Sequence, residues 1–102
     1  MHPIIESKRA ELAAVCRPFG VRRLEVFGSA ARNDFDETRS DIDFLVEFDA
    51  SEKYPVLTTY FGLKDALQQL FHRPVDLVSM GAIENPFILA SIERNRQLVY
   101  AA

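Results

Sequence analysis

Residues 41–48 constrain the fold of this chain most, because they read Asp-Ile-Asp-Phe-Leu-Val-Glu-Phe. Phe44, Leu45 and Val46 form a continuous apolar run, without the alternation of a strand that has one wet face. Such a run predicts a central strand, buried on both faces of a sheet. The chain has 102 residues, the size of one domain with one core. We therefore expect residues 1–102 to form a single domain around this strand.

The segments on either side of this strand alternate between helical and extended patterns. Apolar residues at helical spacing predict amphipathic helices over residues 4–19 and 55–70, and Asn85-Pro86 predicts a last helix that ends near residue 94. Further strands are expected at 21–27 and 73–78, with a short final strand at 97–100. This order predicts an α+β fold, in which a small mixed β-sheet has helices packed against it in layers.

The composition excludes several classes of protein. The net charge is -3, so the chain lacks the positive footprint expected of a protein that binds nucleic acid strongly by itself. No apolar run approaches the roughly 20 residues of a membrane helix, and the first residues do not resemble a secretory signal. Cys16 is the single cysteine, and its apolar neighbours predict a buried thiol. We expect a cytoplasmic protein without a membrane segment.

Gly28 and Ser29 directly follow the strand expected at residues 21–27. Glycine breaks the strand and permits close approach of the backbone to a ligand, and Ser29 is a good N-cap for a short helix through Arg32. A turn of this kind aims unpaired N–H groups at an anion, and the Ser29 hydroxyl can add a donor to a β- or γ-phosphate oxygen. The pair therefore predicts a phosphate-binding turn, followed by a polar loop at 33–40.

Three aspartates predict a metal site close to this turn. Asp41 and Asp43 are two residues apart on one strand, so their side chains point to the same face about 7 Å apart. Two carboxylates repel each other unless a cation lies between them, and magnesium prefers oxygen ligands of this kind. Asp76 stands among apolar residues of the next expected strand, which is either an edge strand with Asp76 facing water or a strand beside Asp41 and Asp43. On a neighbouring strand it would complete a two-metal site for in-line displacement, as metal ligand and possible base.

Gly28-Ser29, the segment Asp41-Ile42-Asp43-Phe44-Leu45-Val46 and the later Asp76 resemble the minimal nucleotidyltransferases (MNT) of the DNA polymerase β superfamily. The resemblance spans nearly the whole chain. It implies the nucleotidyltransferase fold, a three-carboxylate site for two magnesium ions, and transfer of a nucleoside monophosphate, AMP from ATP, with release of pyrophosphate. The superfamily usually has ten residues between the serine and the first aspartate. This chain has eleven, and a polar loop can absorb the extra residue.

Two further residues are candidates for the site. Arg32 follows the turn by one helical turn and is expected either to contact phosphate or to pair with a carboxylate of the loop. Ser40 directly precedes Asp41 and could brace the metal-binding loop through a hydrogen bond.

The resemblance also implies a partner. Such minimal proteins are commonly encoded beside a helical HEPN protein, often an RNase toxin, and act as its antitoxin; some similar members transfer AMP to a tyrosine of the toxin. A domain of this size has little room for a second substrate pocket, so we expect the acceptor hydroxyl on the partner. A binding-only antitoxin that masks its partner without catalysis is the alternative. Retention of Asp41, Asp43 and Asp76 favours the enzyme.

Overall fold

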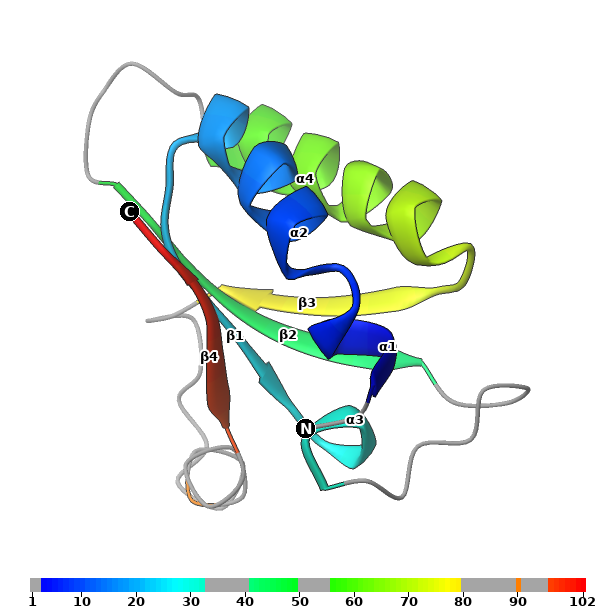
Figure 1. Cartoon of the computed structure of the whole chain (residues 1–102). Coiled ribbons are helices and arrows are strands. Elements are labelled where there is room, and N and C mark those ends of the chain that lie inside the picture. Colours follow the sequence, from blue (N-terminus) through cyan, green and yellow to red (C-terminus); the bar gives the residue numbers. More distant parts are fainter. Residues whose placement is uncertain (1–2, 33–40, 50–55, 80–89, 91–95) are drawn as a thin grey trace.

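The structure is a computed structural model, and it describes residues 3–32, 41–49, 56–79, 90 and 96–102 (Figure 1). In chain order the elements are α1 (Pro3–Glu6), α2 (Arg9–Cys16), the 3-10 turn η1 (Arg17–Phe19), β1 (Val21–Phe27), α3 (Ser29–Arg32), β2 (Ile42–Phe48), α4 (Val56–Phe71), β3 (Val75–Ser79) and β4 (Gln97–Ala101). The strands form one sheet, and α2 and α4 cover one of its faces. The predicted α+β fold is confirmed.

The sheet has the strand order β3-β2-β1-β4. β1 pairs antiparallel with both β2 and β4, whereas β2 and β3 are parallel. Parallel neighbours need a long crossover connection, and α4 occupies that position between β2 and β3. The sheet is therefore mixed, as predicted, with β2 and β1 at its centre.

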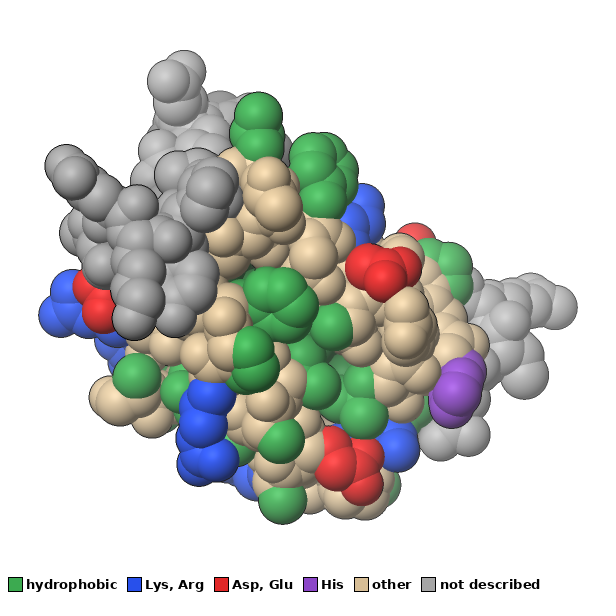
Figure 2. All heavy atoms as spheres, turned by 90° about the horizontal axis from the view of Figure 1, so that it is seen from above, with side chains coloured by type: hydrophobic (Ala, Val, Ile, Leu, Met, Phe, Trp, Pro, Cys, Tyr) green, Lys and Arg blue, Asp and Glu red, His purple; other side chains and the backbone are tan. Residues whose placement is uncertain are grey.

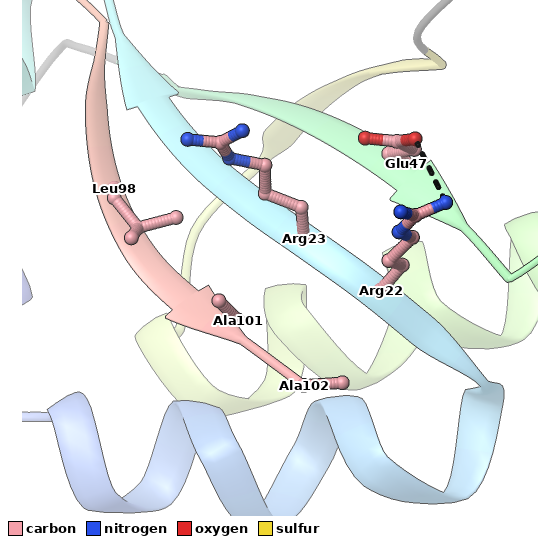
Figure 3. Close-up of a pocket in the computed structure, with 6 residues that line it drawn as sticks. All are labelled: Arg22, Arg23, Glu47, Leu98, Ala101 and Ala102. Atoms are coloured by element: carbon pink, nitrogen blue, oxygen red, sulfur yellow. Dashed lines mark ion pairs between the residues drawn. The ribbon is translucent and has the colours of Figure 1, made fainter.

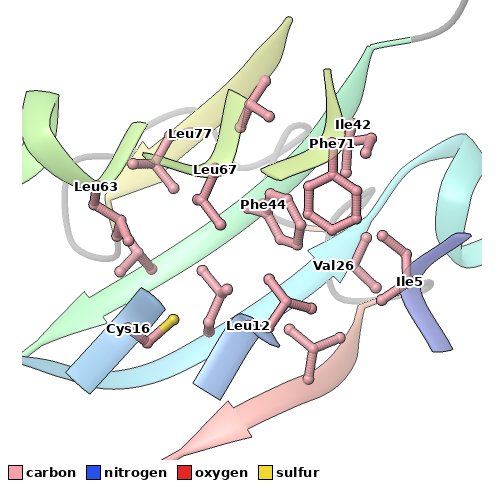
Figure 4. Packing of buried hydrophobic residues seen from close by; sticks show 14 of the residues in the cluster. Ile5, Leu12, Cys16, Val26, Ile42, Phe44, Leu63, Leu67, Phe71 and Leu77 are labelled. Atoms are coloured by element: carbon pink, nitrogen blue, oxygen red, sulfur yellow. The ribbon is translucent and has the colours of Figure 1, made fainter. Parts of the chain in front are cut away.

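The core lies between the sheet and the two long helices (Figure 4). Phe44 of β2 and Phe71 of α4 are in ring contact, with their centroids 5.8 Å apart. Leu45 points to the opposite face of β2 from Phe44 because strand side chains alternate, and yet only 3% of it is exposed. β2 is thus buried on both faces, which confirms what its continuous apolar run predicts.

The prediction of one continuous helix at the start of the chain is wrong. The sequence pattern favours one helix over 4–19, whereas the structure has α1, α2 and η1, with a break at Lys8, whose φ is -118° and ψ 18°. The six residues between Ile5 and Leu12 are polar or small, so they supply no apolar contact to hold a straight helix on the sheet. With this break, both Ile5 of α1 and Leu12 of α2 are completely buried in the core (Figure 4).

Smaller differences concern element ends. β2 begins at Ile42 rather than at Asp41, and β3 covers Val75–Ser79 rather than 73–78. Pro74 precedes β3, where its carbonyl accepts a hydrogen bond from the Ile42 N–H at 3.3 Å. The final strand is confirmed as β4, and the helix predicted at residues 86–94 lies outside the described residues apart from Ala90. In the described part of the chain, no helix has the length and apolar character needed to cross a bilayer.

α4 presents one side to the core and another to solvent. Leu63 and Leu67 are completely buried, whereas Leu57 and Phe61 are 72% and 61% exposed. Figure 2 looks down on the helices and shows apolar side chains at this surface among charged ones. Gly62 lets another element approach α4 closely, since a Cβ at this position would lie 2.8 Å from the Phe19 ring. The glycine within this helix is therefore a packing requirement of η1.

Candidate active site

Asp43 of β2 and Asp76 of β3 are register partners in the parallel pair. Partners on neighbouring strands lie about 5 Å apart and point to the same face of a sheet. The next partners along, Phe44 and Leu77, are buried in the core, so the two aspartates point to the face opposite the helices. Asp43 is half-buried and Asp76 is exposed. The fold thus brings together two carboxylates that are 33 positions apart in the sequence.

Gly28 lies directly against one of these carboxylates. Phe27 of β1 is the register partner of Asp43 of β2. Gly28 follows Phe27, and the chain therefore turns over the Asp43 side chain at Gly28. A Cβ built on Gly28 would lie 2.3 Å from Asp43 Oδ2, and its φ of +71° is in the left-handed region. Any other residue would meet both a clash and backbone strain here. Glycine at this position therefore lets the turn and the carboxylate touch.

α3 begins immediately after this turn. The Ala31 N–H donates to the Gly28 carbonyl at 3.1 Å, and the buried Ala30 and Ala31 anchor the element to the core. α3 is a single helical turn, so it offers a phosphate its first backbone N–H groups and little macrodipole. The side chains of Ser29 and Arg32, and all of Ser40, lie outside the described part of the structure.

Asp41 lies at the entrance of β2 rather than within it, and it is exposed. The prediction that it belongs to the strand is wrong by one residue. Among the described residues, no three His, Cys, Asp or Glu side chains form a ready metal cluster. Asp43 and Asp76 nevertheless supply two oxygen ligands side by side, with Asp41 two residues away, and this donor chemistry fits magnesium.

Tyr60 contacts this region from α4, and the sequence patterns did not single it out. Its hydroxyl donates a hydrogen bond to the Leu77 carbonyl of the edge strand β3. Burial raises the pKa of the Tyr60 hydroxyl, and the negative charge of Asp76 raises it further. Tyr60 therefore ties α4 to the strand that carries Asp76. The only signal in the sequence is its tyrosine hydroxyl on an otherwise apolar helix side.

A pocket of about 210 Å³ lies at the other end of the sheet, at the start of β1. It is lined by Arg22, Arg23, Glu47, Leu98, Ala101 and Ala102. Figure 3 shows Arg22 directed toward Glu47, from which its Nη1 is 3.9 Å away, while Arg23 extends along β1. None of the predicted site residues belongs to this lining, and the exposed Arg22–Glu47 contact contributes little to stability. We do not assign the nucleotide to this pocket.

Comparison with known proteins gives consistent matches. The nucleotidyltransferase domain family matches residues 10–99. A candidate protein adenylyltransferase of Methanocaldococcus jannaschii is 45% identical over 82 residues, which are 80% of this chain and 78% of that protein. A solved structure of a candidate minimal nucleotidyltransferase is 35% identical, with a TM-score of 0.70 over 95% of both chains.

A more distant match has the same fold. It is a chain of the solved complex of a tri-AMPylated Shewanella oneidensis HEPN toxin with an MNT antitoxin, with a TM-score of 0.64 at 15% identity, over 96% of this chain and 73% of that chain.

Proposed function

The chain belongs to the nucleotidyltransferase domain family, and from this premise we propose that it transfers AMP from ATP to a hydroxyl of a partner protein with the help of magnesium. The observation that carries the proposal is the contact between Gly28 and Asp43, with Asp76 in register beside them. A turn that can bind phosphate and a pair of carboxylates that can bind metal thus form one site. A nucleoside triphosphate with bound magnesium requires both.

Two magnesium ions would be held by Asp41, Asp43 and Asp76. Bound there, magnesium would bring the acceptor and the triphosphate together and stabilise the charge that develops during in-line displacement. Asp76 is exposed, so it is accessible to an acceptor hydroxyl and is the candidate to take its proton. Asp43 is half-buried against Gly28, which limits its movement. We therefore assign Asp76 both to metal binding and to proton acceptance, and Asp43 to metal binding alone.

The turn at Gly28 and Ser29 would hold the triphosphate. Backbone N–H groups at the start of α3 would donate hydrogen bonds to its phosphate oxygens, and we assign the Ser29 hydroxyl as a further donor. Arg32 and Ser40 stay predictions for a phosphate contact and for bracing of the metal-binding loop. In the reaction, the acceptor oxygen forms a bond to the α-phosphorus, the bond from that phosphorus to the bridging oxygen breaks, and pyrophosphate leaves with the electron pair.

We assign the acceptor to a tyrosine of a HEPN toxin, for which this chain would be the antitoxin, in the cytoplasm. The assignment is supported by a relative named as a candidate protein adenylyltransferase and by the fold shared with an antitoxin in complex with an AMPylated HEPN toxin.

Incubation of this chain with its HEPN partner, magnesium and ATP labelled in the α-phosphate tests the proposal. The wild type should label the partner, and Asp43→Ala should abolish labelling because it removes a metal ligand. Glu47→Gln is the matched control, since Glu47 lies on the same strand four residues away and is half-buried as well. If the wild type and Asp43→Ala neutralise the partner equally without any label, the chain is an antitoxin that acts by binding alone.

A further inference from the structure

Glu25 of β1 is a buried carboxylate held by two arginines. Its Oε1 lies 2.8 Å from Arg23 Nε, and its Oε2 lies 3.2 Å from Arg96 Nε. The Glu25 side chain is 5% exposed, whereas those of Arg23 and Arg96 are 48% and 36% exposed. Among the described residues Oε2 accepts no well-aligned hydrogen bond, so its contact with Arg96 is mainly one of charge.

A buried ionic group of this kind is a weak contributor to stability. Desolvation of the charges offsets most of their attraction, and well-packed apolar residues often serve as well or better. The neighbours of Glu25 in the sequence, Leu24 and Val26, are both completely buried core residues. Glu25 points to the other face of the sheet because strand side chains alternate, which is also the face of Asp43 and Asp76. The cluster of Glu25 with Arg23 and Arg96 therefore involves the face of the sheet that carries the two aspartates.

The register places Arg96 near the candidate active site. Gln97, the first residue of β4, pairs with Val26 of β1, and Phe27 pairs with Asp43. Arg96 therefore precedes β4 beside Phe27, two strand spacings or about 10 Å from the Asp43 backbone. The side chain of Gln97 also donates to the Ala31 carbonyl of α3 at 3.4 Å. The turn that ends β1 thus has Asp43 on one side and the Arg96 strand on the other.

We infer that Arg96 is a cationic contact for the triphosphate and that Glu25 is the positioning residue that holds it, an inference that rests on the proposed function. A triphosphate next to aspartates needs positive charge besides magnesium, and the pyrophosphate that leaves carries more negative charge than the bound phosphates. A guanidinium has five N–H donors, so Arg96 engaged with Glu25 through Nε retains donors for phosphate oxygens. Arg23 supplies the second positive charge against Glu25, and the cluster has a net positive charge.

The test is the affinity for magnesium–ATP and for AMP, measured by calorimetry on the full chain with Arg96→Ala, Arg96→Lys and Glu25→Gln. Arg96→Ala should weaken magnesium–ATP binding by roughly 10- to 100-fold, the loss of a charge-assisted hydrogen bond, and leave AMP binding unchanged. Arg96→Lys should restore part of the affinity, because the charge remains. Glu25→Gln should weaken ATP binding less than Arg96→Ala. Arg22→Ala is the control, because Arg22 is an arginine of β1, the strand of Glu25, and contacts Glu47 instead.

The outcomes separate this inference from the proposed function. Unchanged ATP affinity in Arg96→Ala, alongside a loss in Asp43→Asn, would overturn the role of Arg96 alone. An equal loss of ATP and AMP binding in Arg96→Ala, together with a lower melting temperature, would assign the cluster a structural role and would also overturn it. A wild type that does not bind magnesium–ATP would overturn the proposed function and this inference together.

Discussion

The register of Asp43 with Asp76 predicts that the folded chain carries a built-in repulsion, which a neutral substitution should remove. Two unit charges about 5 Å apart repel by about 0.8 kcal/mol at the dielectric constant of water and by about 3 kcal/mol at an effective value of 20. Asp76 is exposed, so the lower end applies. Asp43→Asn and Asp76→Asn should each stabilise the chain by about 1 kcal/mol in chelator. For a domain of this size the melting temperature should rise by about 4–8 °C.

Thermal unfolding in chelator and in millimolar magnesium measures this effect. Magnesium should raise the melting temperature of the wild type, because it binds the folded state, and should have little effect on either variant. Glu47→Gln is the control, since it removes an attraction to Arg22 and should not stabilise. The reasoning is refuted if both aspartate variants melt below the wild type in chelator, or if magnesium stabilises them as much as the wild type.

Three further predictions concern single positions. Gly28→Ala should cost about 1–3 kcal/mol from its left-handed backbone alone and should displace the Asp43 carboxylate, so both stability and nucleotide affinity should fall; unchanged affinity would contradict the contact. Gly62→Ala should lower the melting temperature despite the better helix propensity of alanine, because its Cβ would press on Phe19. Burial raises the pKa of the Cys16 thiol from 9.0 to about 12, so the thiol should resist alkylation in the folded chain. Because the unfolded thiol ionises near pH 9, this contribution to stability should be constant below pH 9 and be lost as the pH rises to about 12.

Much of the fold is predictable from short stretches of sequence. The run Phe44-Leu45-Val46 predicts a strand buried on both faces, and the apolar spacing through Leu63 and Leu67 predicts the helix that covers it. The broken first helix was not predictable in this way, because helical spacing alone does not report that residues 6–11 lack a core contact. The start of β2 at Ile42 coincides with the hydrogen bond from its N–H to the Pro74 carbonyl, a contact between distant residues.

The candidate site, like the fold, is only partly predictable from the sequence. The spacing of Asp41 and Asp43, together with Gly28-Ser29, is visible in the sequence and led to the resemblance that the family match confirms. The pairing of Asp43 with Asp76 depends on strand order and register, which the sequence only suggests. Glu25 and Arg96 are 71 positions apart and meet only because β4 pairs with β1. A charged residue between Leu24 and Val26 was the one available signal, and alternation explains it equally well.

The most direct test of the central claim compares ATP labelled in the α-phosphate with ATP labelled in the γ-phosphate, in the presence of magnesium and the proposed HEPN partner. Nucleotidyl transfer predicts that the α-label becomes covalently attached to the partner and that the γ-label is released in pyrophosphate. Attachment of the γ-label would instead indicate phosphoryl transfer. Attachment of neither label to a partner that the chain neutralises would contradict the enzymatic account.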